Sequence, residues 1–136
     1  MASKRNSHRF PTPSESGEQI ALFEWAEYQK GAYPILRWMF HVPNGGLRDI
    51  RTAAKLKAEG VKPGVPDIVL PAARGGAHGL YVEMKSREGK PTKEQLDFHD
   101  ALRSEGYYVA ICHSTDEAIQ TILTYLKSPK TQGDAT

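Results

Sequence analysis

GVPDIVL (residues 64–70) and LYVEMK (residues 80–85) are the two stretches of this sequence that decide its predicted fold. Each is a short apolar run, and a glycine- and alanine-rich segment separates them, which is typical of two strands joined as a hairpin. Side chains alternate between the two faces of a strand, so Glu83 and Lys85 point the same way. Pairing of the strands allows Asp67 to lie beside Glu83, which brings two carboxylates and an ammonium group to one end of the sheet.

The segments around this hairpin are predicted to form helices and two further strands. Capping boxes begin at Thr12, Thr92 and Ser114, and each precedes residues that favour a helix. The last strand follows a helical crossover, so we expect it to run parallel to the strand before it. The order α-β-α-β-β-α-β-α predicts an α/β fold with a mixed central sheet flanked by helices. The predicted elements are a helix at 12–29, a strand at 34–42, a helix at 47–59, strands at 65–70 and 80–85, a helix at 92–105, a strand at 107–112 and a helix at 114–126.

The length of 136 residues suits one domain with one hydrophobic core. We expect this domain at residues 12–127, between a flexible basic arm at 1–11 and a flexible tail at 128–136. Cys112 is the only cysteine, which excludes an internal disulfide and a cysteine-based zinc site and predicts a buried, unreactive thiol. The sequence has neither a signal peptide nor a membrane span, so we expect a cytoplasmic location.

The predicted cluster of Asp67, Glu83 and Lys85 has a definite chemical use. Two carboxylates form a hard oxygen site that suits Mg²⁺ or Mn²⁺ together with waters and a substrate phosphate. A neighbouring lysine is able to orient an attacking water or to stabilise charge that develops on the phosphate. These are the parts that phosphodiester hydrolysis needs, whereas the alternative interpretation is a solvated cluster of ion pairs on a sheet face.

Several stretches of the chain match a known family in order and spacing. They are EQ (18–19), HVPNGG (41–46), GVPD (64–67), EMK (83–85), Gln95 and GYYV (106–109). With these stretches the chain resembles the PD-(D/E)XK nuclease superfamily and, within it, the stand-alone VRR-NUC domains. The resemblance extends from about Glu15 to Leu126, and it implies a restriction-endonuclease-like core and a nuclease activity.

The resemblance also implies roles for single residues. Asp67, Glu83 and the backbone carbonyl of Met84 would bind the metal ion, and Lys85 would assist the attacking water. Glu18 resembles the first-helix glutamate of the family, which reaches the metal site; its alternative is an ordinary glutamate favoured by the helix dipole.

Gln95 resembles a glutamine that points into the active site of the family. The residue also fits the third helical position of the Thr92 capping box, so both interpretations stay open. A zinc site is rejected, because His41 has no second histidine or cysteine at a useful spacing.

The net charge of +2 permits binding to nucleic acid without requiring it. Asn44 and His41 belong to the turn after the first predicted strand, and either contact DNA phosphate or hold the turn. A basic stripe on the predicted helix at 47–59 and cations in the loops near the acidic cluster are candidates for contacts with DNA phosphates, with a solvated charged face as the alternative. These candidates are Arg48, Arg51, Lys55, Lys62, Arg87, Lys90 and Lys93.

Stand-alone members of this family resemble Holliday junction resolvases of phages and bacteria that act as homodimers. We therefore expect a Mg²⁺- or Mn²⁺-dependent endonuclease that selects branched DNA by shape, because the sequence contains no added module for reading bases. The alternatives are a nickase or a flap or repair nuclease of the same fold, a catalytically silent DNA-binding module, and a metal-dependent hydrolase of small molecules.

Overall fold

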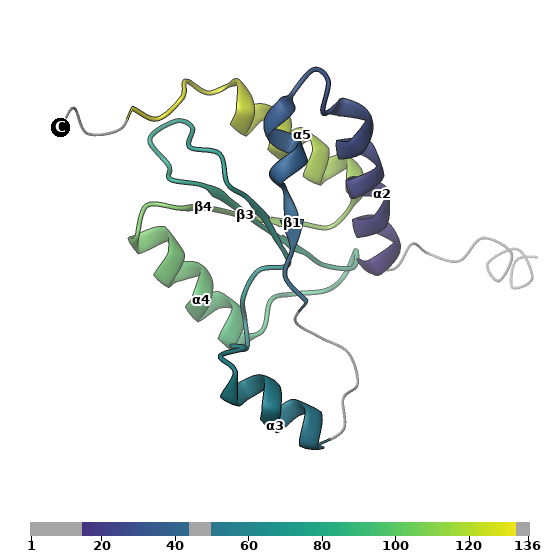
Figure 1. The fold of residues 1–136 in the computed structure, drawn as a ribbon, viewed down its shortest axis with the longest axis vertical. Helices are drawn as coiled ribbons and strands as arrows, with labels where there is room; N and C mark the ends of the chain where they lie inside the picture. The colour runs from purple at the N-terminus through teal and green to yellow at the C-terminus, as the bar shows by residue number, and fades with distance from the viewer. Residues whose placement is uncertain (1–14, 44–49, 133–136) are drawn as a thin grey trace, which may run out of the picture.

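The predicted hairpin lies at the centre of a mixed sheet that has helices on both faces (Figure 1). The structure is a computed structural model and describes residues 15–43 and 50–132. Within these ranges the helices are α2 (Glu15–Gln29), α3 (Ile50–Ala58), α4 (Lys93–Ser104) and α5 (Thr115–Lys127), with the 3₁₀ helix η1 (Pro34–Trp38). The strands are β1 (Phe40–His41), β2 (Ile68–Leu70), β3 (Leu80–Met84) and β4 (Tyr108–Cys112).

The sheet has the order β1-β2-β3-β4. β1 and β3 are both antiparallel to β2, and β4 is parallel to β3 with α4 as the crossover. This topology confirms the predicted mixed sheet of the α/β class, and it confirms that the last two strands run in the same direction. The predicted β-strands at 65–70 and 80–85 are shorter in the structure, so Asp67 lies just before β2 and Lys85 just after β3.

The two faces of β3 have different environments. Leu80, Val82 and Met84 are buried in the hydrophobic core, where they join apolar side chains of α2 and α5 such as Leu22 and Ile122. The alternate residues of the strand point to the opposite face, which α4 covers (Figure 1). The polar group of residues at the end of β3 therefore lies on the α4 side, away from the main core.

The predicted strand at 34–42 is wrong over most of its length. Pro34 to Trp38 form the 3₁₀ helix η1, and only Phe40 and His41 pair with β2. Leu36 and Met39 are buried, whereas Trp38 is 61% and Phe40 49% exposed. Burial therefore follows a spacing of three residues rather than two, and the alternation of apolar residues that suggested a strand does not correspond to burial.

The helix starts agree with the predicted caps where the structure describes them. The Thr92 side chain and Gln95 form a reciprocal capping box at the start of α4. Ser114 caps α5, because its side chain accepts from the N–H of Glu117. The second bond of the predicted capping box differs, since the Glu117 carboxylate accepts from the N–H of His113, the residue before the cap. Thr12, the first predicted cap, lies outside the described residues.

Helix α3 stands apart from the rest of the fold (Figure 1). In the part of the chain that the structure describes, it has no close backbone contact with another helix or strand. The described part of this helix begins at Ile50. The predicted helix start at residue 47 and residues 44–46 of the predicted turn lie outside the described residues. Across residues 15–43 and 50–132, no helix combines the length and the apolar character that crossing a membrane requires.

Part of the expected C-terminal tail is attached to the domain. The carbonyl of Pro129 accepts from the N–H of Gly75, and the N–H of Thr131 donates to the carbonyl of Ala73. Residues 129–131, which the sequence analysis expects to belong to a flexible tail, thus run along the β2–β3 loop. The arm at 1–11 and residues 133–136 are outside the described residues. Cys112 is buried as predicted, and burial raises the pKa of its thiol.

Candidate active site

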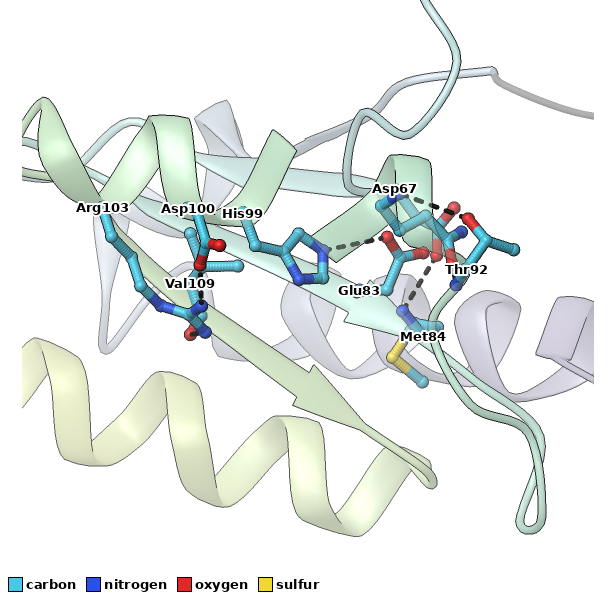
Figure 2. A network of polar contacts seen from close by, with 9 residues as sticks. Asp67, Glu83, Met84, Thr92, His99, Asp100, Arg103 and Val109 are labelled. Carbon is cyan, nitrogen blue, oxygen red and sulfur yellow. Dashed lines mark hydrogen bonds and ion pairs between the residues drawn. The ribbon is translucent and has the colours of Figure 1, made fainter. Parts of the chain in front are cut away.

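Asp67 and Glu83 lie side by side at one end of the β2–β3 hairpin. The strands pair Ile68 with Val82, so continuing this antiparallel register by one residue places Asp67 opposite Glu83. The N–H of Met84 donates a hydrogen bond of 2.9 Å to Oδ2 of Asp67 (Figure 2). This contact holds the Asp67 side chain against the end of β3, which is the arrangement that the sequence predicted for the two carboxyl groups.

The backbone of Asp67 is held from its other side by β1. Its carbonyl oxygen accepts from the N–H of Val42 at 2.7 Å. The same oxygen accepts from Nδ1 of His41 at 3.0 Å, so the structure places His41 as a support for the Asp67 backbone. Asp67 therefore has little freedom although it precedes the strand.

Glu83 is an unusual carboxylic acid, since it is only 1% exposed. Burial raises the pKa of Glu83 to about 9, and the neighbouring carboxyl group of Asp67 adds to this rise, while Lys85 opposes it. The negative charge of one carboxylate disfavours a second charge beside it, which is how Asp67 adds to the rise in the pKa of Glu83. A divalent cation would relieve the same repulsion.

The Asp67–Glu83 pair opens into a cleft with a volume of about 590 Å³. The cleft is bordered by β1, α2 and the start of α4 in addition to the hairpin. Its lining residues are mostly polar or charged, and they include Lys85, as the sequence predicted: Glu15, Ser16, Gln19, His41, Pro43, Asp67, Glu83, Met84, Lys85 and Gln95.

The donor set fits a hard divalent cation. Asp67 and Glu83 supply two carboxylates, and Mg²⁺ is commonly held by one or two protein carboxylates with waters and substrate phosphate completing its shell. No third histidine, cysteine or carboxylate joins them closely enough to complete an all-protein site among the residues that the structure describes. An open site of this kind leaves coordination positions for a substrate.

Glu18 does not face the cleft, contrary to the expected role at the metal site. Its carboxylate accepts hydrogen bonds from the N–H and the hydroxyl of Thr115, the first residue of α5. The hydroxyl of Thr115 also contacts the Glu18 carbonyl at 2.9 Å. Glu18 thus joins α2 to the N-terminus of α5, where the helix dipole favours a negative charge.

Glu15 is the glutamate of α2 that lines the cleft. Its charge adds slightly to the rise in the pKa of Glu83, whose main cause is burial. One helical turn separates Glu15 from Glu18, and one turn leaves the two residues on similar but not identical faces. The sequence analysis selected Glu18 alone, and the packing of α2 against β3 and α5 instead brings Glu15 to the cleft.

Gln95 combines the two interpretations that the sequence left open. Its Oε1 accepts from the N–H of Thr92 at 2.8 Å, which completes the capping box. The residue also lines the cleft. The cap holds the Gln95 side chain at the rim of the site rather than leaving it free to reach the carboxylates.

The candidate DNA-binding residues that the structure describes lie in α3, in loops and at the start of α4. Arg51 and Lys55 belong to α3, and Lys55, Lys62 and Arg87 are exposed, as are Lys90 and Lys93. Asn44 and Arg48 lie outside the described residues.

His99 was not among the residues that the sequence analysis selected. It belongs to α4, it is fully buried, and its Nε2 lies 3.4 Å from Oε1 of Glu83 (Figure 2). Burial lowers the pKa of His99, so its ring is neutral around neutral pH. The helical spacing would have placed His99 one turn from Gln95 on α4, but the sequence carries no sign of which strand it faces.

A second cavity of about 340 Å³ lies at the opposite end of the hairpin, between its loop and α5. Arg74, Tyr108 and Tyr125 are among its lining residues, and none of the residues around it is acidic. Of these two cavities, only the larger cleft has carboxylates in its lining.

Comparison with known proteins identifies the family and a solved structure with the same fold. A family model described as the VRR-NUC domain matches residues 13–116. A solved structure named VRR_NUC domain protein is similar to this chain, with 30% sequence identity and a TM-score of 0.76. The similarity covers 90% of this chain and 96% of that one. No curated protein matches the chain.

Proposed function

Because the chain belongs to the VRR-NUC domain family, a family of nuclease type, we propose that it is a metal-dependent DNA endonuclease that selects branched substrates. The observation that carries this proposal is the contact pair of Asp67 and Glu83, with Lys85 beside it, in an open cleft. An isolated ion-pair cluster on a sheet face would be solvated, whereas Glu83 is buried and shares its surroundings with a second acid.

In this proposal Asp67, Glu83 and the backbone carbonyl of Met84 hold Mg²⁺ or Mn²⁺. When bound there, the ion supplies polarisation of the scissile phosphate and a lowered pKa of a bound water. Lys85 follows the last residue of β3 and lines the same cleft, so its ammonium group orients the attacking water or stabilises the negative charge of the transition state.

The other polar residues of the cleft have supporting roles. Glu15 lines the same cleft as a third carboxylate, and it would hold water there. Gln95 keeps α4 anchored by its cap and offers its amide N–H₂ group to the substrate side of the cleft. Glu18 is not assigned to the site, since its carboxylate is occupied at Thr115.

Cations around the cleft would bind the backbone phosphates of DNA. Arg51 and Lys55 on the protruding helix α3, together with Lys62 and Arg87 in the loops, are our candidates, and Asn44 and Arg48 extend this set into residues that the structure does not describe. Phosphate contacts of this kind hold the substrate without reading its sequence. They favour recognition of DNA shape.

We propose a four-way junction as the substrate and a homodimer as the working form. One chain offers one acidic site, whereas resolving a junction requires cuts in two strands. A two-fold dimer supplies two sites with a symmetry that matches the junction. The alternative is a nickase or a flap nuclease of the same fold. Such an enzyme cuts one strand, for which the single site of one chain is sufficient.

Cleavage of linear, flap and four-way DNA in the presence of Mg²⁺ tests this function, with sedimentation of the same protein at micromolar concentration. Paired nicks across the four-way junction by a dimer are the expected result. Equal activity on linear and branched DNA by a monomer would favour the general nickase. Binding of DNA without cleavage of any substrate would identify a silent DNA-binding module.

A further inference from the structure

The buried His99 contacts the candidate metal ligand Glu83 from the side that faces away from the cleft. Its ring is 0% exposed, and Nε2 lies 3.4 Å from Oε1 of Glu83, the long end of the hydrogen-bond range. Figure 2 shows the Glu83 carboxyl group between the imidazole on one side and Asp67 on the other. His99 does not line the cleft, so any effect of this residue on substrate must pass through Glu83.

The surroundings of the ring select one of its two neutral tautomers. Nδ1 of His99 is buried and has no hydrogen-bond partner in the described structure. A proton on Nδ1 would leave a buried donor without an acceptor, and it would also direct the lone pair of Nε2 at an oxygen of Glu83. A proton on Nε2 satisfies the donor at Glu83 and leaves only an acceptor lone pair unpaired.

The same tautomer suits a Glu83 that binds a metal ion. With a divalent cation held there, Glu83 would be a carboxylate, and its Oε1 would accept from the Nε2–H of His99 as a charged acceptor.

We propose that His99 is a positioning residue whose Nε2–H holds the Glu83 carboxylate in the orientation that binds the divalent cation. The inference rests on the proposed function, because it concerns the same metal site. Carboxylates that bind metals are commonly held by hydrogen bonds from a second layer of residues, and loss of such a partner typically weakens metal affinity by about 10- to 100-fold. The competing explanation is that His99 only fills space between α4 and β3.

Two substitutions separate these explanations. In His99→Phe an aromatic ring of similar size fills the space and the donor is lost. In His99→Gln the side-chain amide places an N–H₂ group near the position of Nε2, so the donor is retained in a smaller and more flexible side chain. If His99 only fills space, His99→Phe should keep the affinity for the metal ion better than His99→Gln. If His99 positions Glu83, His99→Gln should keep that affinity better.

The decisive measurement is the affinity of the full-length, metal-free protein for Mn²⁺ by titration calorimetry, without DNA. We expect His99→Phe to bind Mn²⁺ about 10- to 100-fold more weakly than the wild type, and His99→Gln to stay within a few-fold of it. Unchanged affinity in His99→Phe, or affinity lost equally in both variants, would overturn the inference. A wild type without affinity for Mn²⁺ would instead defeat the proposed metal-dependent function, and the positioning role with it.

A spectroscopic measurement on the wild type keeps the inference testable if a variant fails to fold. Long-range ¹H–¹⁵N correlation spectra of the histidine rings distinguish a protonated from an unprotonated nitrogen. In the metal-free protein near neutral pH we expect His99 to carry its proton on Nε2 alone. The opposite tautomer would contradict the hydrogen bond to Glu83 and overturn the inference.

Discussion

The N–H of Met84 donates to Oδ2 of Asp67 at 2.9 Å, so the end of β3 holds the side chain that precedes β2. Met84 is itself buried in the core on the opposite face of the strand. The backbone of Met84 thus links the hydrophobic packing of the sheet to the position of the Asp67 carboxylate. This arrangement makes the geometry of the acid pair depend on the register of the hairpin.

Asp67→Asn, Glu83→Gln and Lys85→Ala should each reduce DNA cleavage by about 10³-fold or more, because residues that act as one unit lose activity together. The two amide substitutions conserve shape, so thermal unfolding should remain cooperative and the melting temperature should not fall. Arg37→Ala is a suitable control, since Arg37 lies in η1 and is exposed outside the cleft. A near-wild-type cleavage rate in any of the three variants would refute the site assignment.

Removal of divalent cations should stop cleavage while DNA binding persists. The acid pair in the cleft provides only oxygen ligands, which suit Mg²⁺ and Mn²⁺, and Ca²⁺ should support binding without turnover. Mn²⁺ at about 100 times its dissociation constant should also stabilise the wild type by about 2.7 kcal/mol, and this stabilisation should be absent in Glu83→Gln. Cleavage that continues at full rate in excess EDTA would rule out the metal-dependent mechanism.

The stability of the metal-free protein should fall as the pH rises between about 4.5 and about 9. Burial beside Asp67 raises the pKa of Glu83 from 4.5 to about 9, so the folded state binds a proton that the unfolded state has already released in this range. Stability decreases with pH wherever the folded state binds more protons. Urea unfolding of the EDTA-treated wild type and of Glu83→Gln should therefore diverge toward high pH, with the variant the more stable. Parallel pH profiles for the two proteins would show that Glu83 is ionised in the folded state.

Glu18→Ala should lower stability, and Glu15→Ala should lower activity. Glu18 accepts from the start of α5, so its loss should cost about 1–2 kcal/mol in urea unfolding, while the folded protein keeps its cleavage rate. Glu15 is exposed and lines the cleft, so its substitution should reduce cleavage with little change in stability. Each variant serves as the control for the other. A loss of cleavage in Glu18→Ala together with unchanged cleavage in Glu15→Ala would support a role for Glu18 at the metal site.

Gly64→Ala should be more damaging than Gly60→Ala. Both glycines have a positive φ, +89° and +104°, so both substitutions carry the backbone strain of an L-residue, about 1–3 kcal/mol. At Gly64 the added Cβ would also overlap with the backbone carbonyl of Glu94 in the first turn of α4, whereas at Gly60 it meets open space. The difference in unfolding free energy between the variants measures this close approach. Equal losses would mean that the loop before Asp67 moves away from α4 without cost.

Local patterns in the sequence were sufficient for the hairpin and most of the helices. Alternation along residues 80–85 placed Glu83 and Lys85 on one face, and the two-residue period of a strand makes that result independent of the rest of the chain. The Thr92 capping box is equally local, since both of its hydrogen bonds join residues three positions apart. The adjacency of Asp67 and Glu83 followed from these elements because antiparallel neighbours lie opposite each other.

Contacts between distant segments decided the rest. η1 replaced a predicted strand because packing buried Leu36 and Met39, a choice that the apolar residues at 36, 38, 40 and 42 could not reveal. Glu15 and Glu18 are one helical turn apart in the same helix. Glu18 contacts Thr115 of α5, which is 97 residues away in the sequence, whereas Glu15 lines the cleft. His99 meets Glu83 only because α4, which packs against β4, lies on the face of the sheet to which Glu83 points. Side-chain periodicity is a property of one element, whereas burial and long-range hydrogen bonds depend on how the elements pack against each other.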